Sequence, residues 1–387
     1  PYVVSWAYAN WGHEADAIDA LLAGARAQSF EDFLAGVEII GVSQHTTYAD
    51  RDGNIGYAMT GFDPIRAPGV DPRFPHVGDG TQEWTGEYRP RAHDSNTAQG
   101  YYGGWNNKAS IDYNSAPNGA YYGPAHRAHV IDEYLSTHDN LSFEEVRDLA
   151  LNIATTDGLM TGGNTWSFVA DAFSAAVAAN SSPARDAAID MLDAWDGHFV
   201  AGGPAAWPMG TDRADAWVLQ DAWIREVLRI TFEDEFRASG MSWEDQSKYV
   251  LFNVLVRALQ GQDAALPTLY DWFQDAAGTG DKPVGAEAII VRALDNVIEH
   301  EGLGPYNEPR GTISHSHGVF TFVDILGPLW AETPYSRRST YAQVVEYDMN
   351  GPARIESMFP LGESGETLPD AYGQLWINPN FFSMVPA

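Results

Sequence analysis

The sequence predicts an α+β fold with a large helical region. Apolar residues recur at the spacing of a buried helix face through much of residues 128–310. Strand-like runs on either side of this region flank Asp-Gly or Asn-Gly pairs, which are typical of β-hairpins. Residues 48–127 are rich in Gly, Pro, Trp and Asn, a composition typical of loops around a site. We therefore divide the chain into a helical lead-in at 1–47, a hairpin with site-lining loops at 48–127, a mainly helical region at 128–310, and C-terminal strands and loops at 311–387.

The composition excludes several classes of function. With 44% hydrophobic residues in 387, the chain is globular. Its net charge of -31 repels phosphate backbones and anionic membranes, so we expect no nucleic acid partner. It has no Cys, which excludes disulfides, thiolate catalysis and Cys-based zinc sites. No apolar run has the length of a membrane span, and no organic cofactor is indicated.

Lysine is rare, and the acidity has two interpretations. Only Lys108, Lys248 and Lys282 are present, so Arg supplies the rest of the 22 basic residues. A large carboxylate excess with little Lys favours adaptation to high salt, where screening removes most of the self-repulsion. The alternative is an acidic protein from a GC-rich genome without any such adaptation.

The first elements are two helices and a hairpin. Apolar residues within 12–27 have helical spacing, and Ser29 precedes acidic residues as the N-cap of a second helix. Strand-like runs at 45–50 and 55–60 flank an Asp-Gly turn. The turn is also similar to a calcium-binding loop, but its glycine and closing Glu are misplaced, so a tight turn is the better interpretation.

A loop region and a series of helices follow. Five prolines within residues 61–104 forbid long regular elements. Helices resume near residue 125, and Ser142 with Glu145 forms a capping box. Further helices are predicted at 182–195, 212–238 and 285–300. A second hairpin is predicted from strands at 343–347 and 353–359.

Two familiar kinds of site are not indicated. His126 with His129 and His315 with His317 have spacings that a metal accepts, but neither pair has further ligands nearby in the sequence. The candidate nucleophiles Ser5, Ser43 and Ser95 all lack the Gly-x-Ser-x-Gly context of a nucleophile elbow. A hydrolytic Ser is therefore not visible in this chain.

An ordered series of short motifs nevertheless resembles a known family. The motifs are Tyr48-Ala49-Asp50, Asp52-Gly53-Asn54-Ile55-Gly56-Tyr57, Thr60-Gly61, Pro64-Ile65-Arg66, Asp71-Pro72-Arg73, Glu83-Trp84-Thr85-Gly86, Gly100-Tyr101, Trp105-Asn106-Asn107 and Arg127. In this order and spacing they resemble the penicillin acylase family of N-terminal-nucleophile hydrolases, in the distal part of its β-chain. The resemblance covers Trp6 to Leu135 and returns at Gly362-Glu363-Ser364-Gly365-Glu366, which looks like the family's closing loop.

The resemblance implies a fold and two site residues. The fold would be the αββα sandwich, completed by another segment, beside the large helical region. Amide hydrolysis passes through a tetrahedral oxyanion, which a fixed side-chain amide stabilises. By resemblance Asn106 is this donor, and Arg127 orients the amino terminus of the nucleophile chain and helps to bind the polar end of the substrate.

The chain departs from the family pattern at the nucleophile and at calcium. The family uses an N-terminal Ser, Thr or Cys with its own amine as base, whereas this chain begins with Pro1 and has no initiator Met. We therefore expect a processed or truncated piece, inactive alone, whose autoproteolytically processed partner chain carries the nucleophile. The resemblance also implies structural calcium on the backbone carbonyl of Pro72, although Asp112 lies too early to match the acidic ligand.

The expected function is that of a linear-amide hydrolase that releases a carboxylic acid and an amine. An N-acyl β-lactam and an N-acyl homoserine lactone remain alternative substrates, the second implying quorum quenching. A protein of another class, with the fold but without catalysis, is the rival hypothesis. For the complete enzyme we expect export to an extracellular or periplasmic compartment.

Overall fold

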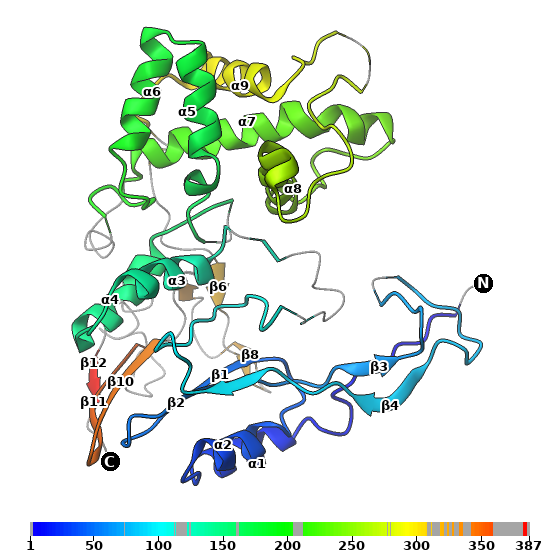
Figure 1. Ribbon diagram of the computed structural model, residues 1–387, viewed down its shortest axis with the longest axis vertical. Helices are drawn as coiled ribbons and strands as arrows, with labels where there is room; N and C mark the ends of the chain where they lie inside the picture. The colour runs from blue at the N-terminus through cyan, green and yellow to red at the C-terminus, as the bar shows by residue number, and fades with distance from the viewer. Residues whose placement is uncertain are drawn as a thin grey trace.

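The computed structural model covers most of the chain. The residues that it describes are 3–72, 74–111, 113, 122–123, 125–159, 162–203, 212–276, 278, 280–307, 311, 318–320, 323–324, 327–328, 333–335, 342–358 and 382–384. Figure 1 shows β1 to β4 with α1 and α2 at one end of the molecule, α3 and α4 in the middle, and the helices α5 to α9 at the other end.

The first two helices form a pair against the hairpin. Helix α1 spans Asp16–Gly24 and α2 spans Phe30–Val37. The Ser29 hydroxyl accepts a hydrogen bond from the backbone N–H of Asp32 at 3.1 Å, which confirms the predicted N-cap. Helix α2 in turn packs on strand β2.

The first sheet has the order β1-β2-β5 and is antiparallel throughout. Strands β1 (His45–Ala49) and β2 (Ile55–Met59) form the predicted hairpin, and β5 (His93–Ser95) pairs with β2. In the turn, Asp50 Oδ1 accepts backbone hydrogen bonds from Asp52 and Asn54, both at 2.9 Å. The carboxylate therefore closes the turn, in agreement with the prediction.

The loop region contains more strand than the sequence indicates. Besides β5, a two-stranded sheet pairs β3 (Pro64–Arg66) with β4 (Trp84–Tyr88). Proline keeps these strands short, and Pro64 stands at the first position of its strand, where a missing N–H is tolerated. A long loop joins β3 to β4, and β5 pairs with the earlier strand β2, so no tight turn marks these strands in the sequence.

Helices α3 (Arg127–Thr137) and α4 (Phe143–Ala154) connect the sheets to the helical region. The predicted capping box is present, since the N–H of Ser142 donates to Glu145 Oε2 at 2.7 Å and the N–H of Glu145 donates to Ser142 Oγ at 3.3 Å. Helix α4 packs on strand β10.

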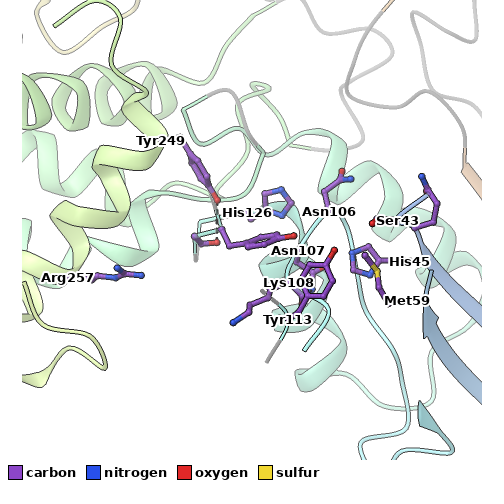
Figure 2. Close-up of a pocket in the computed structure, with 13 residues that line it drawn as sticks. Ser43, His45, Met59, Asn106, Asn107, Lys108, Tyr113, His126, Tyr249 and Arg257 are labelled. Carbon is purple, nitrogen blue, oxygen red and sulfur yellow. Dashed lines mark hydrogen bonds between the residues drawn. The ribbon is translucent and has the colours of Figure 1, made fainter. Parts of the chain in front are cut away.

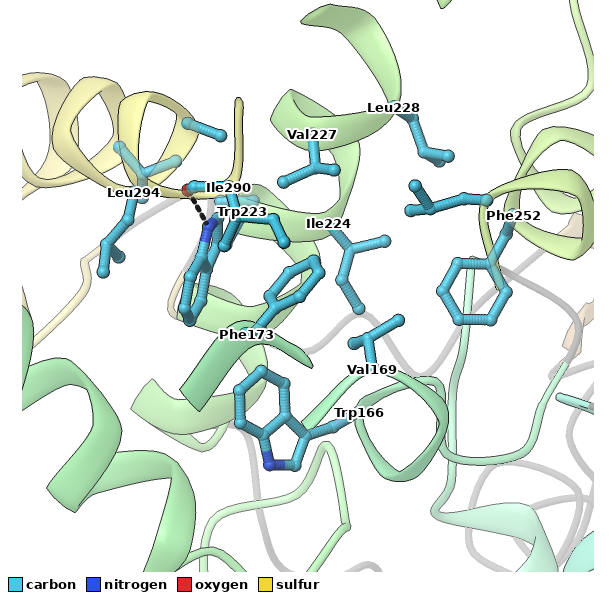
Figure 3. Packing of buried hydrophobic residues seen from close by; sticks show 14 of the residues in the cluster. Trp166, Val169, Phe173, Trp223, Ile224, Val227, Leu228, Phe252, Ile290 and Leu294 are labelled. Carbon is cyan, nitrogen blue, oxygen red and sulfur yellow. Dashed lines mark hydrogen bonds between the residues drawn. The ribbon is translucent and has the colours of Figure 1, made fainter. Parts of the chain in front are cut away.

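The helical region has one main core. Its helices are α5 (Ala170–Ala179), α6 (Pro183–Asp193), α7 (Asp215–Ala238), α8 (Lys248–Gln260) and α9 (Ala286–Glu301), with single turns η2 (Trp166–Phe168) and η4 (Gly261–Asp263). Figure 3 shows Trp223 of α7 fully buried between Phe173 and Ile290. Its indole N–H donates to the carbonyl of Ile290 at 2.9 Å, so the one polar atom of the ring is satisfied. The predicted apolar faces of α7 and α9 lie in this core.

The described C-terminal residues form short antiparallel strands. They are β6 (Gly318–Phe320), β7 (Val323–Asp324), β8 (Gly327–Pro328), β9 (Thr333–Tyr335), β10 (Ala342–Asp348), β11 (Gly351–Met358) and β12 (Phe382–Met384). The predicted hairpin is β10–β11, and β12 extends its sheet. The expected closing loop at 362–366 lies outside the described residues. The fold is α+β, and no described helix is both long and apolar enough to cross a membrane.

Candidate active site

A cavity of about 720 Å³ lies where the β1–β2 hairpin, the loop after Gly104 and helix α8 meet. Figure 2 shows Tyr249 and Arg257 on the α8 side and Ser43 and His45 on the hairpin side. Elements far apart in the sequence therefore build one site, and the resemblance-based candidate Asn106 lies in its wall.

The backbone and side chain of Asn106 are both fixed. Asn106 has a φ of 55°, a left-handed conformation that Asn tolerates better than most residues. Its Oδ1 accepts a hydrogen bond from Nη2 of Arg127 at 2.9 Å. Because a guanidinium has only donors, the atom that it meets is the amide oxygen. The Asn106 NH₂ is the end that remains to donate to a ligand.

Arg127 is held by its surroundings at the start of α3. Its guanidinium lies over the ring of Trp105, 4.9 Å from the centroid, and this contact adds a cation–π interaction. Its side chain also passes Gly162, where a Cβ would lie 2.3 Å from Arg127 Cγ. Gly162 has a φ of +77°, so it supplies both the backbone conformation and the space.

Two histidines of the cavity are held neutral by burial. His126 is the N-cap of α3, where its Nδ1 accepts from the N–H of Ala128 at 3.4 Å. Burial, and then the adjacent Arg127 charge, lower the pKa of His126 to about 4. His45 Nδ1 is hydrogen-bonded to the Tyr57 hydroxyl at 2.7 Å, and burial lowers the pKa of His45 as well. At neutral pH, neither ring adds positive charge to the site.

The serines and histidines considered from the sequence lie partly inside and partly outside the cavity. Ser43 lines the cavity, whereas Ser5 and Ser95 do not. On α3, Nε2 of His129 lies 4.0 Å from Oε2 of Glu133. His315 and His317 are outside the described residues.

The calcium expectation remains a prediction. Pro72 lies in the loop after β3 and does not line the cavity, while Arg73 and Asp112 are outside the described part of the chain. Within that part, no three acidic or histidine side chains converge as metal ligands would. The described residues thus supply no set of metal ligands around the Pro72 carbonyl, and no catalytic step is assigned to calcium.

Sequence reasoning missed the wall formed by α8 and the glycine behind Arg127. Tyr249 and Arg257 occur in a helix whose pattern indicates only packing, and their approach to the hairpin depends on the tertiary fold. Gly162 and Gly163 do give a signal, because a Gly pair between helices marks a turn. The Cβ of an alanine at 163 would lie 2.8 Å from the backbone nitrogen of His126.

Comparisons with known proteins agree on a family. The family model for penicillin amidase matches residues 2–373. Penicillin G acylase from Escherichia coli is 27% identical in an alignment of 276 residues that covers 65% of this chain and 30% of that protein. This chain thus spans less than a third of the length of that curated relative.

A solved structure shows the same fold. Thermostable penicillin G acylase from Alcaligenes faecalis in orthorhombic form superposes with a TM-score of 0.72 over 97% of this chain and 70% of that chain, at 23% identity. This likeness confirms the predicted N-terminal-nucleophile hydrolase fold. With a family match over nearly its whole length, the chain belongs to the penicillin amidase family.

Proposed function

We propose that this chain is part of an acylase that hydrolyses a linear N-acyl amide to a carboxylic acid and an amine. The observation that carries the proposal is the hydrogen bond from Arg127 to the oxygen of Asn106 at the wall of a large cavity. It fixes which end of the amide faces a ligand. Family membership supports the reaction class.

The Asn106 NH₂ is the oxyanion donor in this mechanism. Attack on the substrate carbonyl creates a negatively charged tetrahedral oxygen, and a donor that is already oriented stabilises it without reorganisation. Removal of one such donor typically costs about 3 kcal/mol of transition-state stabilisation. Arg127 polarises the same amide group through its oxygen and prevents the side chain from rotating.

We place the nucleophile on a complementary segment that begins with Ser, Thr or Cys. Its hydroxyl or thiol would attack the carbonyl, and its own α-amine would take the proton. The resemblance to the distal β-chain supports this assignment, as does the share of 30% of the curated relative that the chain covers. In this proposal the chain alone is inactive, and the complete enzyme is processed and exported.

Two substrate classes fit the proposal. The relatives named above are penicillin G acylases, which favours an N-acyl β-lactam. An N-acyl homoserine lactone is the second candidate, because it presents the same acyl amide to the same donor. The rival, a protein with this fold and no catalysis, predicts that no complementary segment begins with Ser, Thr or Cys.

Substitution of Asn106 in the complete protein tests the mechanism. We expect Asn106→Ala to lower kcat by roughly 10²–10³-fold while the protein stays folded. Because alanine is strained at a φ of 55°, Asn106→Gly is the matched variant that removes the amide without that strain. Both variants should lose turnover of an acyl amide, which is measured by the release of the amine. Wild-type rates in the glycine variant would exclude Asn106 as the oxyanion donor.

A further inference from the structure

We propose that the α8 side of the cavity is a subsite for a carboxylate on the substrate, with Arg257 as its counter-ion. This inference rests on the proposed hydrolysis at Asn106 and specifies its substrate class. Arg257 and Asn106 line the same cavity from different elements, the first from α8 and the second from the loop before α3 (Figure 2). A substrate that fills the cavity therefore meets both.

Three side chains form a stripe on α8. Tyr249, Asn253 and Arg257 are four residues apart, so they lie on one face of the helix. The Tyr249 hydroxyl donates to the carbonyl of Gly123 at 3.3 Å, which fixes α8 against the cavity wall. A Cβ at Gly123 would lie 2.0 Å from Asn253 Oδ1, so glycine permits this close approach. The position of Arg257 is thus set by a packed interface.

The charges around the cavity differ from those of the whole chain. The sequence has 53 acidic and 22 basic residues. Among the described residues that line the cavity, however, there is no Asp or Glu, while Lys108 and Arg257 both line it. A cavity with this charge attracts anions that the rest of the surface repels.

Arg257 also differs from three arginines of other helices in the helical region. Arg185, Arg225 and Arg229 pair with carboxylates at 2.7 Å. Arg257 is partly buried in the last turn of α8. Within the described part of the chain, no carboxylate or hydrogen-bond acceptor contacts its guanidinium. A partly desolvated guanidinium is stabilised by a counter-ion, and a planar carboxylate matches its paired donors.

Lys108 and two tyrosines of the cavity wall can contact the same ligand. Lys108 uses one donor on the carbonyl of Ile111, which leaves two of its three N–H groups. The rings of Tyr113 and Tyr122, which also line the cavity, are 6.4 Å apart between centroids. They favour an apolar or aromatic link between the scissile amide and the carboxylate.

The carboxylate has two possible sources, the acyl part or the amine part of the substrate. Two pairs of amides distinguish them in the complete enzyme. Glutaryl anilide against pentanoyl anilide tests the acyl part, and phenylacetyl-4-aminobenzoate against phenylacetyl anilide tests the amine part. We expect kcat/KM to favour the charged member of one pair by about tenfold or more, as for a hydrogen bond to a charged group.

Variants then assign the preference to Arg257. Arg257→Gln should abolish it while kcat/KM for the neutral member stays within about twofold, and Arg257→Lys should retain part of it. Arg237→Gln is the matched control, because this arginine of α7 loses the same charge but is 72% exposed and pairs with Glu233. The subsite would be overturned if kcat/KM of the wild type were equal for both members in both pairs. It would also be overturned if Arg257→Gln lowered kcat/KM equally for the charged and the neutral member.

A binding measurement distinguishes failure of the subsite from failure of the proposed function. Calorimetry with glutarate and with 4-aminobenzoate measures carboxylate affinity in Asn106→Gly, without turnover. If this variant binds one of them and the affinity falls about tenfold or more on adding Arg257→Gln, the subsite stands even if the wild type cleaves no amide. If the wild type cleaves the neutral amides but neither carboxylate binds, the hydrolase remains and the subsite is wrong.

Discussion

At the scale of residues, the site consists of polar groups whose directions are fixed by their neighbours. Arg127 determines which atom of Asn106 faces the cavity, and Trp105 holds Arg127 in place. Burial keeps His45 and His126 neutral, so the charge near the proposed oxyanion comes from arginine and lysine. A permanent guanidinium near a developing oxyanion is useful because its charge does not change with pH.

The depressed pKa of His126 predicts a pH dependence of stability. The pKa is 6.5 in the unfolded chain and about 4 in the folded protein, so between these values the unfolded state binds the extra proton. The contribution of His126 to the free energy of unfolding is therefore fully present above pH 6.5 and is lost as the pH falls toward 4, by at most about 3 kcal/mol.

The matched variant for this prediction is His126→Asn. Asparagine also caps a helix N-terminus but does not titrate, so the loss of stability between neutral pH and about pH 4 should become smaller. His45, whose pKa is also lowered, leaves part of the slope in place. Chemical denaturation at several pH values measures the slope, and identical slopes in the two proteins would contradict a neutral His126 in the folded protein.

At the scale of elements, the start of α3 connects the loop that carries Asn106 to the helical region. The glycines at 162 and 163 bring their loop against His126 and Arg127, because any side chain there would collide with them. The loop thus acts as a support for the arginine that orients Asn106. A change in this loop should affect turnover without contacting the substrate.

Gly162→Ala tests this support. The added Cβ would lie 2.3 Å from Arg127 Cγ, so the arginine must move, and we expect kcat to fall about tenfold while KM changes less. Gly240→Ala is the control, since Gly240 also has a positive φ, of +73°, but nothing lies within 4 Å of its added Cβ. Both variants should lose about 1 kcal/mol of stability from backbone strain. Equal kcat values for the two would show that the position of Arg127 does not depend on Gly162.

Local chemistry explains which elements the sequence predicts well. The caps at Ser29 and Ser142 and the turn at Asp50 each depend on residues within five positions, so their sequence pattern is sufficient. Strands β3, β4 and β5 depend on partners far along the chain, and Tyr57, for example, pairs with Asp94. Their residues carry no local signal for such pairing.

At the scale of the whole molecule, the dominant feature is the net charge of -31. Self-repulsion of this size destabilises a compact state unless salt screens it. The Debye length falls from about 30 Å at 0.01 M salt to about 3 Å at 1 M. We therefore propose that the protein is adapted to high salt.

This proposal predicts that the Tm of the complete protein rises as potassium chloride increases from about 0.01 M to about 1 M. Sucrose at matched osmolality is the control, because it favours compact states by exclusion from the surface but does not screen charge. A Tm that is the same at both salt concentrations would favour the alternative, an acidic protein without salt adaptation.

The sequence by itself determined the fold class, most helices, both long hairpins and, through an ordered set of motifs, the family. It also singled out Asn106 and Arg127, whose roles in catalysis remain predictions. These features depend on local propensity and on residue types that a series of motifs preserves. Only the tertiary structure decided how the pair is oriented, that His126 is partly buried, and that Arg257 of α8 shares a cavity with Asn106. Burial, pKa and the direction of a side chain depend on segments that meet only after folding, and no local pattern of residues encodes that meeting.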